Sequence, residues 1–188
     1  MLEIHLFGGL RVSLDAQPWR LTTLPRTLSL WGYLLLHRER PVARDTITYT
    51  LWPAAAETAA RANLRRHLHD LRRALPLAPP GTPWVLAKRE SLQWNPAAPF
   101  WLDVTEFELL SGPEDRLSEA VALYTGDLLP EINEDWAFTE RERLRRLYFT
   151  DLHRLVTRHR ERQEFAQAIT LTQQLLAHDP LQKMRSVI

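Results

Sequence analysis

The chain has 188 residues, of which 45% are hydrophobic and 25% are charged, the composition of a folded soluble protein. It contains no cysteine, which excludes disulfides, thiol nucleophiles and metal sites built on thiolates. Its formal net charge is only +1. The N-terminus has no basic stretch before a long apolar run, and no segment approaches the roughly 20 apolar residues that span a bilayer. We therefore expect a cytoplasmic protein with no membrane partner.

The small net charge hides an asymmetry between the two parts of the chain. Residues 1–100 carry 13 basic and 7 acidic side chains, whereas residues 101–188 carry 11 basic and 16 acidic ones. Such a split suggests two domains with different partners. A basic first domain favours a polyanion such as nucleic acid, and an acidic second domain disfavours it.

The first residues predict a small antiparallel sheet. Residues 2–7 and 10–14 alternate apolar and polar side chains, as strands with one buried face do. Gly8-Gly9 supplies the turn between them. Residues 19–21 are a candidate for a third short strand.

Three helices and a hairpin are expected next. Pro25 suits the first turn of a helix, and leucines at helical spacing continue it. A shorter helix fits residues 45–51, and a third fits residues 57–75, where a proline-rich loop ends it. Residues 84–94 form two short apolar strands around a polar turn, which predicts a hairpin. Residues 95–99 have the composition of a linker.

From about residue 103 the pattern is helical. Helices are expected at residues 104–110, 114–124, 136–162 and 164–180. Helix pairs joined by short loops are typical of an α-hairpin repeat, and the last helix matches the second half of a tetratricopeptide unit. Because a solenoid needs about three repeats to bury a core, we expect the array to be incomplete, and this domain truncated, at residue 188.

The helix expected at 57–75 has two distinct faces. At about 100° per residue, counted from Arg61, its leucines and Ala60 occupy an arc of about 260–340°, and its basic side chains an arc of about 0–140°. Asp70 lies near 180°, outside the basic arc. Solvated helices commonly mix both signs of charge, and arginine suits bidentate contact with phosphate and guanine. The pattern favours a polyanion-binding face; the alternative is a solvated face in an arginine-rich protein.

The order of sheet, helix, short helix, basic helix and hairpin is that of a winged helix-turn-helix. In such a domain the third helix enters the major groove, and the hairpin tip, here Lys88 and Arg89, reaches phosphate. The predicted fold class is α+β: an N-terminal winged helix-turn-helix domain in residues 1–97, followed by an all-α, TPR-like helical-hairpin domain in residues 98–188.

Several motifs carry a family resemblance. "LRVSLDAQPWRL", "ARANLRRHLHDLRRAL" and "LDVTEFELL" resemble the OmpR-type winged helix of SARP-type antibiotic regulatory activators. "YTGDLLPEINEDWAFTERERLRRLY" and "LLAHDPL" resemble the bacterial transcriptional activator domain that follows it in that family. The resemblance implies a regulator that binds promoter DNA, often at direct repeats, contacts RNA polymerase and self-associates through its helical domain.

Two features depart from the family pattern. Ala43 stands where a serine or threonine commonly caps the second helix, which puts the start of that helix in question by about 1 kcal/mol. The wing turn lacks the usual glycine, so the length of the wing is open.

Ten side chains are candidates for contact with DNA. We expect base or groove contact from Asn63, Arg65, Arg66, His69 and Arg73. We expect phosphate contact from Arg44, Arg61, Arg72, Lys88 and Arg89. The sequence shows no motif of a nucleotide-binding loop, a zinc protease or a serine hydrolase, and its histidines lack metal spacing. We therefore expect no catalysis, no cofactor and no metal.

The sequence thus predicts a sequence-specific DNA-binding transcriptional regulator, an activator with helix 57–75 in the major groove and wing 84–94 beside it. The expected partners are double-stranded promoter DNA, RNA polymerase, and a second copy as a homodimer or in tandem on direct repeats. Such a protein acts at the nucleoid. The alternative is a protein–protein interaction scaffold that keeps the winged helix without binding DNA.

Overall fold

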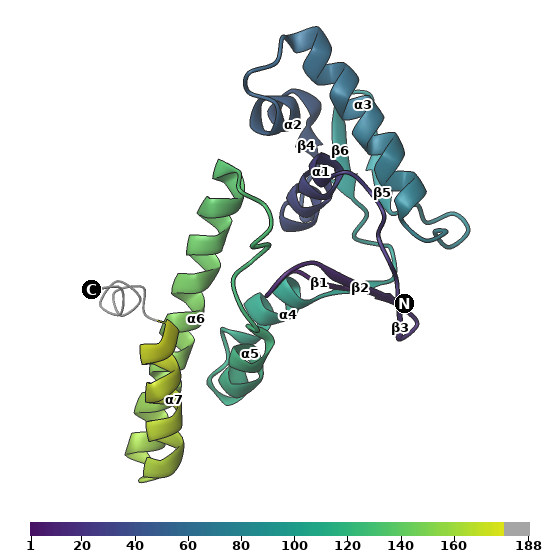
Figure 1. Cartoon of the computed structure of the whole chain (residues 1–188). Coiled ribbons are helices and arrows are strands. Elements are labelled where there is room, and N and C mark those ends of the chain that lie inside the picture. Colours follow the sequence, from purple (N-terminus) through teal and green to yellow (C-terminus); the bar gives the residue numbers. More distant parts are fainter. Residues whose placement is uncertain (179–188) are drawn as a thin grey trace.

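The computed structural model describes residues 1–178, and Figure 1 shows two parts that meet at a small sheet. One part holds three helices and a hairpin, and the other holds the remaining helices, including the longest one. The elements follow the expected order along the chain. None of the helices within residues 1–178 is both long and apolar enough to cross a membrane.

The sheet between the two parts has four strands in the order β3-β2-β1-β7. These are β1 (Leu2–His5), β2 (Arg11–Leu14), β3 (Gln17–Pro18) and β7 (Phe100–Leu102). β1 and β2 pair antiparallel, as expected, but the third strand lies at 17–18, so its prediction at 19–21 is wrong. β7 pairs parallel with β1, which makes the sheet mixed. The predicted domain boundary at residue 97 falls just before this strand.

The winged-helix part contains α1 (Pro25–Leu36), α2 (Arg44–Leu51) and α3 (Glu57–Ala74), all close to their expected bounds. Its hairpin consists of β5 (Val85–Ala87) and β6 (Ser91–Trp94), and β4 (Val42–Ala43) pairs with β6 in a sheet ordered β4-β6-β5. Trp31 of α1 and Trp94 of β6 are fully buried, with ring centroids 5.9 Å apart. The wing is therefore fastened to the core of the helices.

Residues 19–21 turn away from the sheet because Trp19 is held elsewhere. Its backbone N–H donates to the carbonyl of Val12, but its indole Nε1 donates to the carbonyl of Ala74 at 3.0 Å. Ala74 is the last residue of α3. The chain between the first sheet and α1 is thus pulled toward the end of the basic helix instead of extending the sheet.

The helical part begins with α4 (Asp103–Leu110) and ends, within the described residues, with α7 (Phe165–His178). The helix expected at 114–124 is divided into a 3-10 turn (Glu114–Arg116) and α5 (Leu117–Leu123). α6 (Asp135–Glu161) is the long helix, and α7 packs along it after a short turn (Figure 1). Residues 179 and 180 of the last expected helix, and most of the "LLAHDPL" motif, lie outside the described residues.

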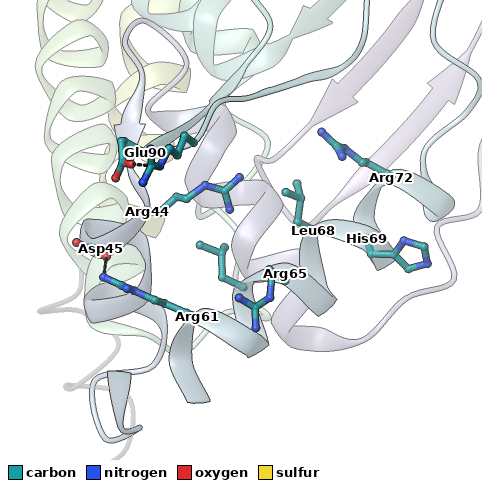
Figure 2. A pocket seen from close by; sticks show the side chains of 10 residues that line it. Arg44, Asp45, Arg61, Arg65, Leu68, His69, Arg72 and Glu90 are labelled. Carbon is teal, nitrogen blue, oxygen red and sulfur yellow. Dashed lines mark hydrogen bonds and ion pairs between the residues drawn. The ribbon is translucent and has the colours of Figure 1, made fainter. Parts of the chain in front are cut away.

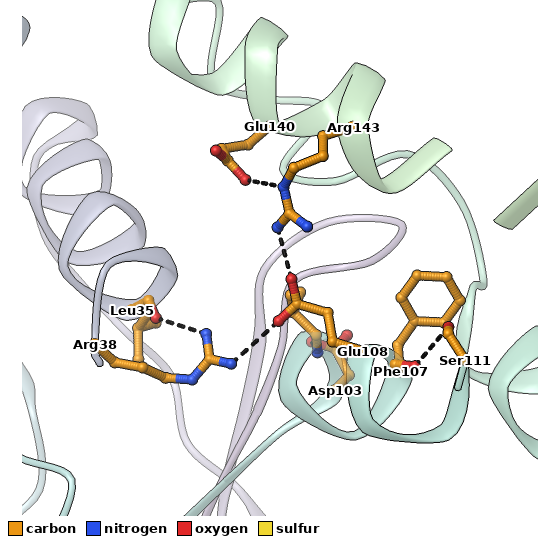
Figure 3. A network of polar contacts seen from close by, with 9 residues as sticks. Leu35, Arg38, Asp103, Phe107, Glu108, Ser111, Glu140 and Arg143 are labelled. Carbon is orange, nitrogen blue, oxygen red and sulfur yellow. Dashed lines mark hydrogen bonds and ion pairs between the residues drawn. The ribbon is translucent and has the colours of Figure 1, made fainter. Parts of the chain in front are cut away.

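The two parts are tied together by charged side chains, shown in Figure 3. Glu108 of α4 accepts a hydrogen bond from Arg38, just after α1, at 3.2 Å and another from Arg143 of α6 at 2.6 Å. Arg38 and Glu108 are largely shielded from solvent. One carboxylate therefore bridges the winged helix to the long helix of the second part.

The loop between α5 and α6 makes the second tie. The buried guanidinium of Arg141 donates to the carbonyls of Leu128, Leu129 and Ile132 at 2.7–3.0 Å, which fixes the shape of this loop. Leu129 then packs against Gly32 of α1: a Cβ at that glycine would lie 2.8 Å from the leucine methyl. The loop can approach α1 this closely because residue 32 has no side chain.

Candidate nucleic-acid interface

α3 has the two faces that its sequence predicts. Its inward face is buried and consists of Ala60, Leu64, His67, Leu68 and Leu71. Its basic side chains are on the exposed side. The leucines stabilise the helix by packing on α1 and α2, and the arginines take no part in that core. The outward charges are therefore available to a partner.

His67 belongs to the packing of α3 and not to its outer face. It is buried, its ring is stacked on that of Trp52 with centroids 5.5 Å apart, and its Nδ1 shares a hydrogen bond of 2.8 Å with the hydroxyl of Thr27. Burial, reinforced by the nearby charge of Arg66, lowers the pKa of His67. This histidine is therefore neutral at physiological pH and contributes no charge to a DNA contact.

A concave surface of about 720 Å³ lies where α2, α3 and the wing tip meet. Figure 2 shows it. Six of the ten candidate side chains line it: Arg44, Arg61, Arg65, His69, Arg72 and Arg89. Its floor is apolar, with Leu64 and Leu68 of α3. We call it the basic concavity. The fold thus brings together cations from three elements that are separate in the sequence.

Arg44 joins the start of α2 to the wing. Its backbone N–H donates to the carbonyl of Glu90 at 2.9 Å, and its side-chain Nε donates to the carbonyl of Lys88 at 3.1 Å. Ala43 gives α2 no side-chain cap, as its sequence implies. The helix nevertheless begins at Arg44, because the pairing of β4 with β6 brings a wing carbonyl to its first N–H.

Positive charge is concentrated in the basic concavity. Partial burial lowers the pKa of Arg44, and the nearby charges of Arg72 and Arg65 lower it further. Like charges held this close repel one another, and the repulsion is relieved when an anion enters. Backbone packing of α2, α3 and the wing holds the cations in place, so the surface is prepared for a polyanion.

Three acidic side chains border the same surface, and a helical wheel of residues 60–75 contains none of them. Asp45 of α2 accepts a hydrogen bond from Arg61 at 3.1 Å, and Glu57 lies 2.8 Å from the same guanidinium. Glu90 pairs with Arg89 at the wing tip at 3.2 Å. Glu57 could have been placed by its i,i+4 spacing to Arg61. Asp45 and Glu90 reach the surface only through the tertiary fold.

The remaining four candidates do not line the basic concavity: Asn63, Arg66, Lys88 and Arg73. Arg66 contacts the ring of His67 at 3.3 Å, and Arg73 borders a separate hollow together with Asp70. Lys88 is exposed at the wing tip, where its carbonyl holds Arg44. Their role in binding DNA remains a prediction.

Comparison with known proteins bears on both parts of the chain. Residues 108–184 match the family model described as the bacterial transcriptional activator domain. A search of curated proteins finds no match. Among solved structures, one described as Mycobacterium tuberculosis EmbR in complex with low affinity phosphopeptide is similar, with a TM-score of 0.64 and 19% sequence identity.

That likeness covers 96% of this chain and 52% of the EmbR chain, so this chain spans about half the length of the protein it resembles. At this identity the likeness concerns the fold, and it extends over the winged helix as well as the helical part. The expected fold class is confirmed. By its matched domain and its fold, the chain is a transcriptional regulator of the SARP type, in which a winged helix-turn-helix is followed by a bacterial transcriptional activator domain.

Proposed function

We propose that this regulator binds promoter DNA in a sequence-specific manner, with α3 in the major groove and the wing on the adjacent backbone, and that it activates transcription. The basic concavity is the observation that carries the proposal. Its side chains are arginines with one histidine, and arginine forms bidentate contacts with phosphate and with guanine. In a winged helix-turn-helix, this face of the third helix is the one turned toward DNA.

The position of each side chain supports a division of roles. Arg65 and His69 lie on the exposed face of α3, in line for base edges. Arg44, Arg61, Arg72 and Arg89 surround them and contact phosphate, with Lys88 at the wing tip. Asn63, Arg66 and Arg73 extend the contact along the exposed side of the helix. Phosphate contacts fix the register, and base contacts supply the sequence preference.

The helical part serves protein contacts in this proposal. Residues 101–188 carry an excess of acidic over basic side chains, which disfavours DNA and leaves this part for RNA polymerase and for a second copy of the chain. Two copies bind in tandem on direct repeats or as a homodimer. The regulator works at the nucleoid, where its promoter lies.

Selection of bound duplexes from a random-sequence DNA pool, followed by sequencing, tests the proposal. We expect one enriched motif, present as a repeat if copies bind in tandem. Arg65→Ala is expected to relax the preference at one position of that motif at a cost of about 1–3 kcal/mol. Arg146→Ala, an exposed arginine of α6, is the matched control and is expected to leave the motif unchanged.

The same experiment separates this proposal from a scaffold role. A wild-type protein that is folded but enriches no sequence and binds no duplex would contradict sequence-specific DNA binding. It would favour a winged helix that serves protein contacts alone.

A further inference from the structure

Arg61 is the one cation of the basic concavity that two carboxylates hold at once. Its guanidinium lies 3.1 Å from Asp45 of α2 and 2.8 Å from Glu57, one turn earlier on α3. Figure 2 shows Arg61 turned toward Asp45, whereas Arg65 and Arg72 lie free of either carboxylate. The first turn of α3 therefore presents no net positive charge, although it begins the face proposed to lie on DNA.

We propose that Asp45 and Glu57 limit the sequence-independent affinity of this protein for DNA by competing with phosphate for Arg61. The inference rests on the proposed function and identifies two residues that tune the same surface. A phosphate that approaches Arg61 must displace two carboxylates, and both carboxylates repel the DNA backbone. Arg65, Arg72 and Arg89 keep the attraction that brings DNA to the surface.

The competition is possible because the ion pairs are exposed. The side chains of Arg61, Asp45 and Glu57 are each more than half accessible to solvent. Exposed pairs of this kind are weak, and salt screens them, so a phosphate can replace them. They are strong enough to change the affinity several-fold without preventing binding.

The test compares Asp45→Asn/Glu57→Gln with the wild type on a short random-sequence duplex, by fluorescence anisotropy over a range of salt concentrations. We expect the double variant to bind about fivefold more tightly at low salt. Its plot of log K against log[salt] should be steeper by about 0.9, the value for one additional phosphate contact. Single variants Asp45→Asn and Glu57→Gln should each give part of the gain.

Two controls separate this mechanism from a general change of charge. Asp70→Asn removes one negative charge from α3, but Asp70 borders a different hollow, and it should leave the affinity nearly unchanged. Arg61→Ala should weaken binding more in the double variant than in the wild type, because only there is the guanidinium free for phosphate.

Three outcomes would overturn the inference: no tightening in the double variant, an equal gain from Asp70→Asn, or a gain that Arg61→Ala does not reverse. Melting curves followed by circular dichroism confirm that each variant is folded. A wild type that binds no duplex would overturn the proposed function together with this inference. A wild type that binds as well as the double variant overturns the inference alone.

Discussion

Arg65 and Arg66 are neighbours in the sequence with different surroundings in the fold. Arg65 lines the basic concavity, whereas Arg66 contacts the ring of buried His67. If the concavity is the surface that meets DNA, Arg65→Ala weakens binding by about 1–3 kcal/mol and Arg66→Ala by clearly less. Anisotropy titrations of the two variants on one duplex measure the difference. Equal losses would show that DNA contacts the whole exposed arc of α3.

His67 should make stability depend on pH. Burial lowers its pKa in the folded protein below the ordinary value of 6.5. The unfolded chain therefore takes up a proton at a higher pH than the folded one, and the free energy of unfolding falls as the pH drops below about 6.5 toward the folded pKa. Urea denaturation at a series of pH values should show this loss. In His67→Gln the component disappears, and a profile identical to the wild type would contradict the account.

At the scale of elements, the start of α2 shows how tertiary pairing replaces a local signal. Ala43 has extended backbone angles that suit a capping residue but no side chain to donate or accept, and the carbonyl of Glu90 satisfies the N–H of Arg44. A serine at position 43 can also accept from an N–H farther into the helix. Ala43→Ser should raise the free energy of unfolding by about 0.5–1 kcal/mol.

Urea denaturation measures this gain, with Ala43→Val as the matched variant that cannot cap. A serine variant no more stable than the valine variant would show that the first turn of α2 is already fully satisfied.

The sequence predicts the helices of the winged helix and both strands of the wing because each carries its own periodicity and end signals. Leu64, Leu68 and Leu71 at helical spacing specify the buried face of α3, and the structure confirms it. β7 has no such signal: three residues after a proline-rich stretch become a strand only because β1 offers its free edge. The misplaced third strand has a similar cause, since the indole of Trp19 is bound at the end of α3.

The candidate interface was predictable to the same extent. The basic arc of α3 and the wing pair Lys88-Arg89 can be read from local sequence. That Arg44 meets Arg65 and Arg72, and that Asp45 meets Arg61, depends on how α2 packs on α3. Contacts between elements leave no trace in the periodicity of either element, so the acidic border of the site could not be predicted.

At the scale of the whole molecule, the two parts are joined through few but specific contacts. Glu108 receives hydrogen bonds from Arg38 and Arg143, and Arg38 is buried. Glu108→Gln leaves that guanidinium without its carboxylate partner and should lower the free energy of unfolding by about 1–3 kcal/mol. Urea denaturation checks this.

Glu119→Gln is the control, because Glu119 pairs with Arg116 within one exposed turn and joins no other part of the chain. It should change stability little. Equal effects of the two substitutions would show that the Glu108 bridge contributes no more than a surface ion pair.

The salt dependence of DNA binding tests the central claim most directly. Wild type and Arg65→Ala/Arg72→Ala are titrated against one duplex at several salt concentrations, and log K is plotted against log[salt]. We predict a steep negative slope for the wild type and a slope shallower by about 0.9 for each phosphate contact that the variant has lost. A wild-type affinity that is nearly independent of salt, or a variant with the wild-type slope and affinity, would contradict DNA binding through the basic concavity.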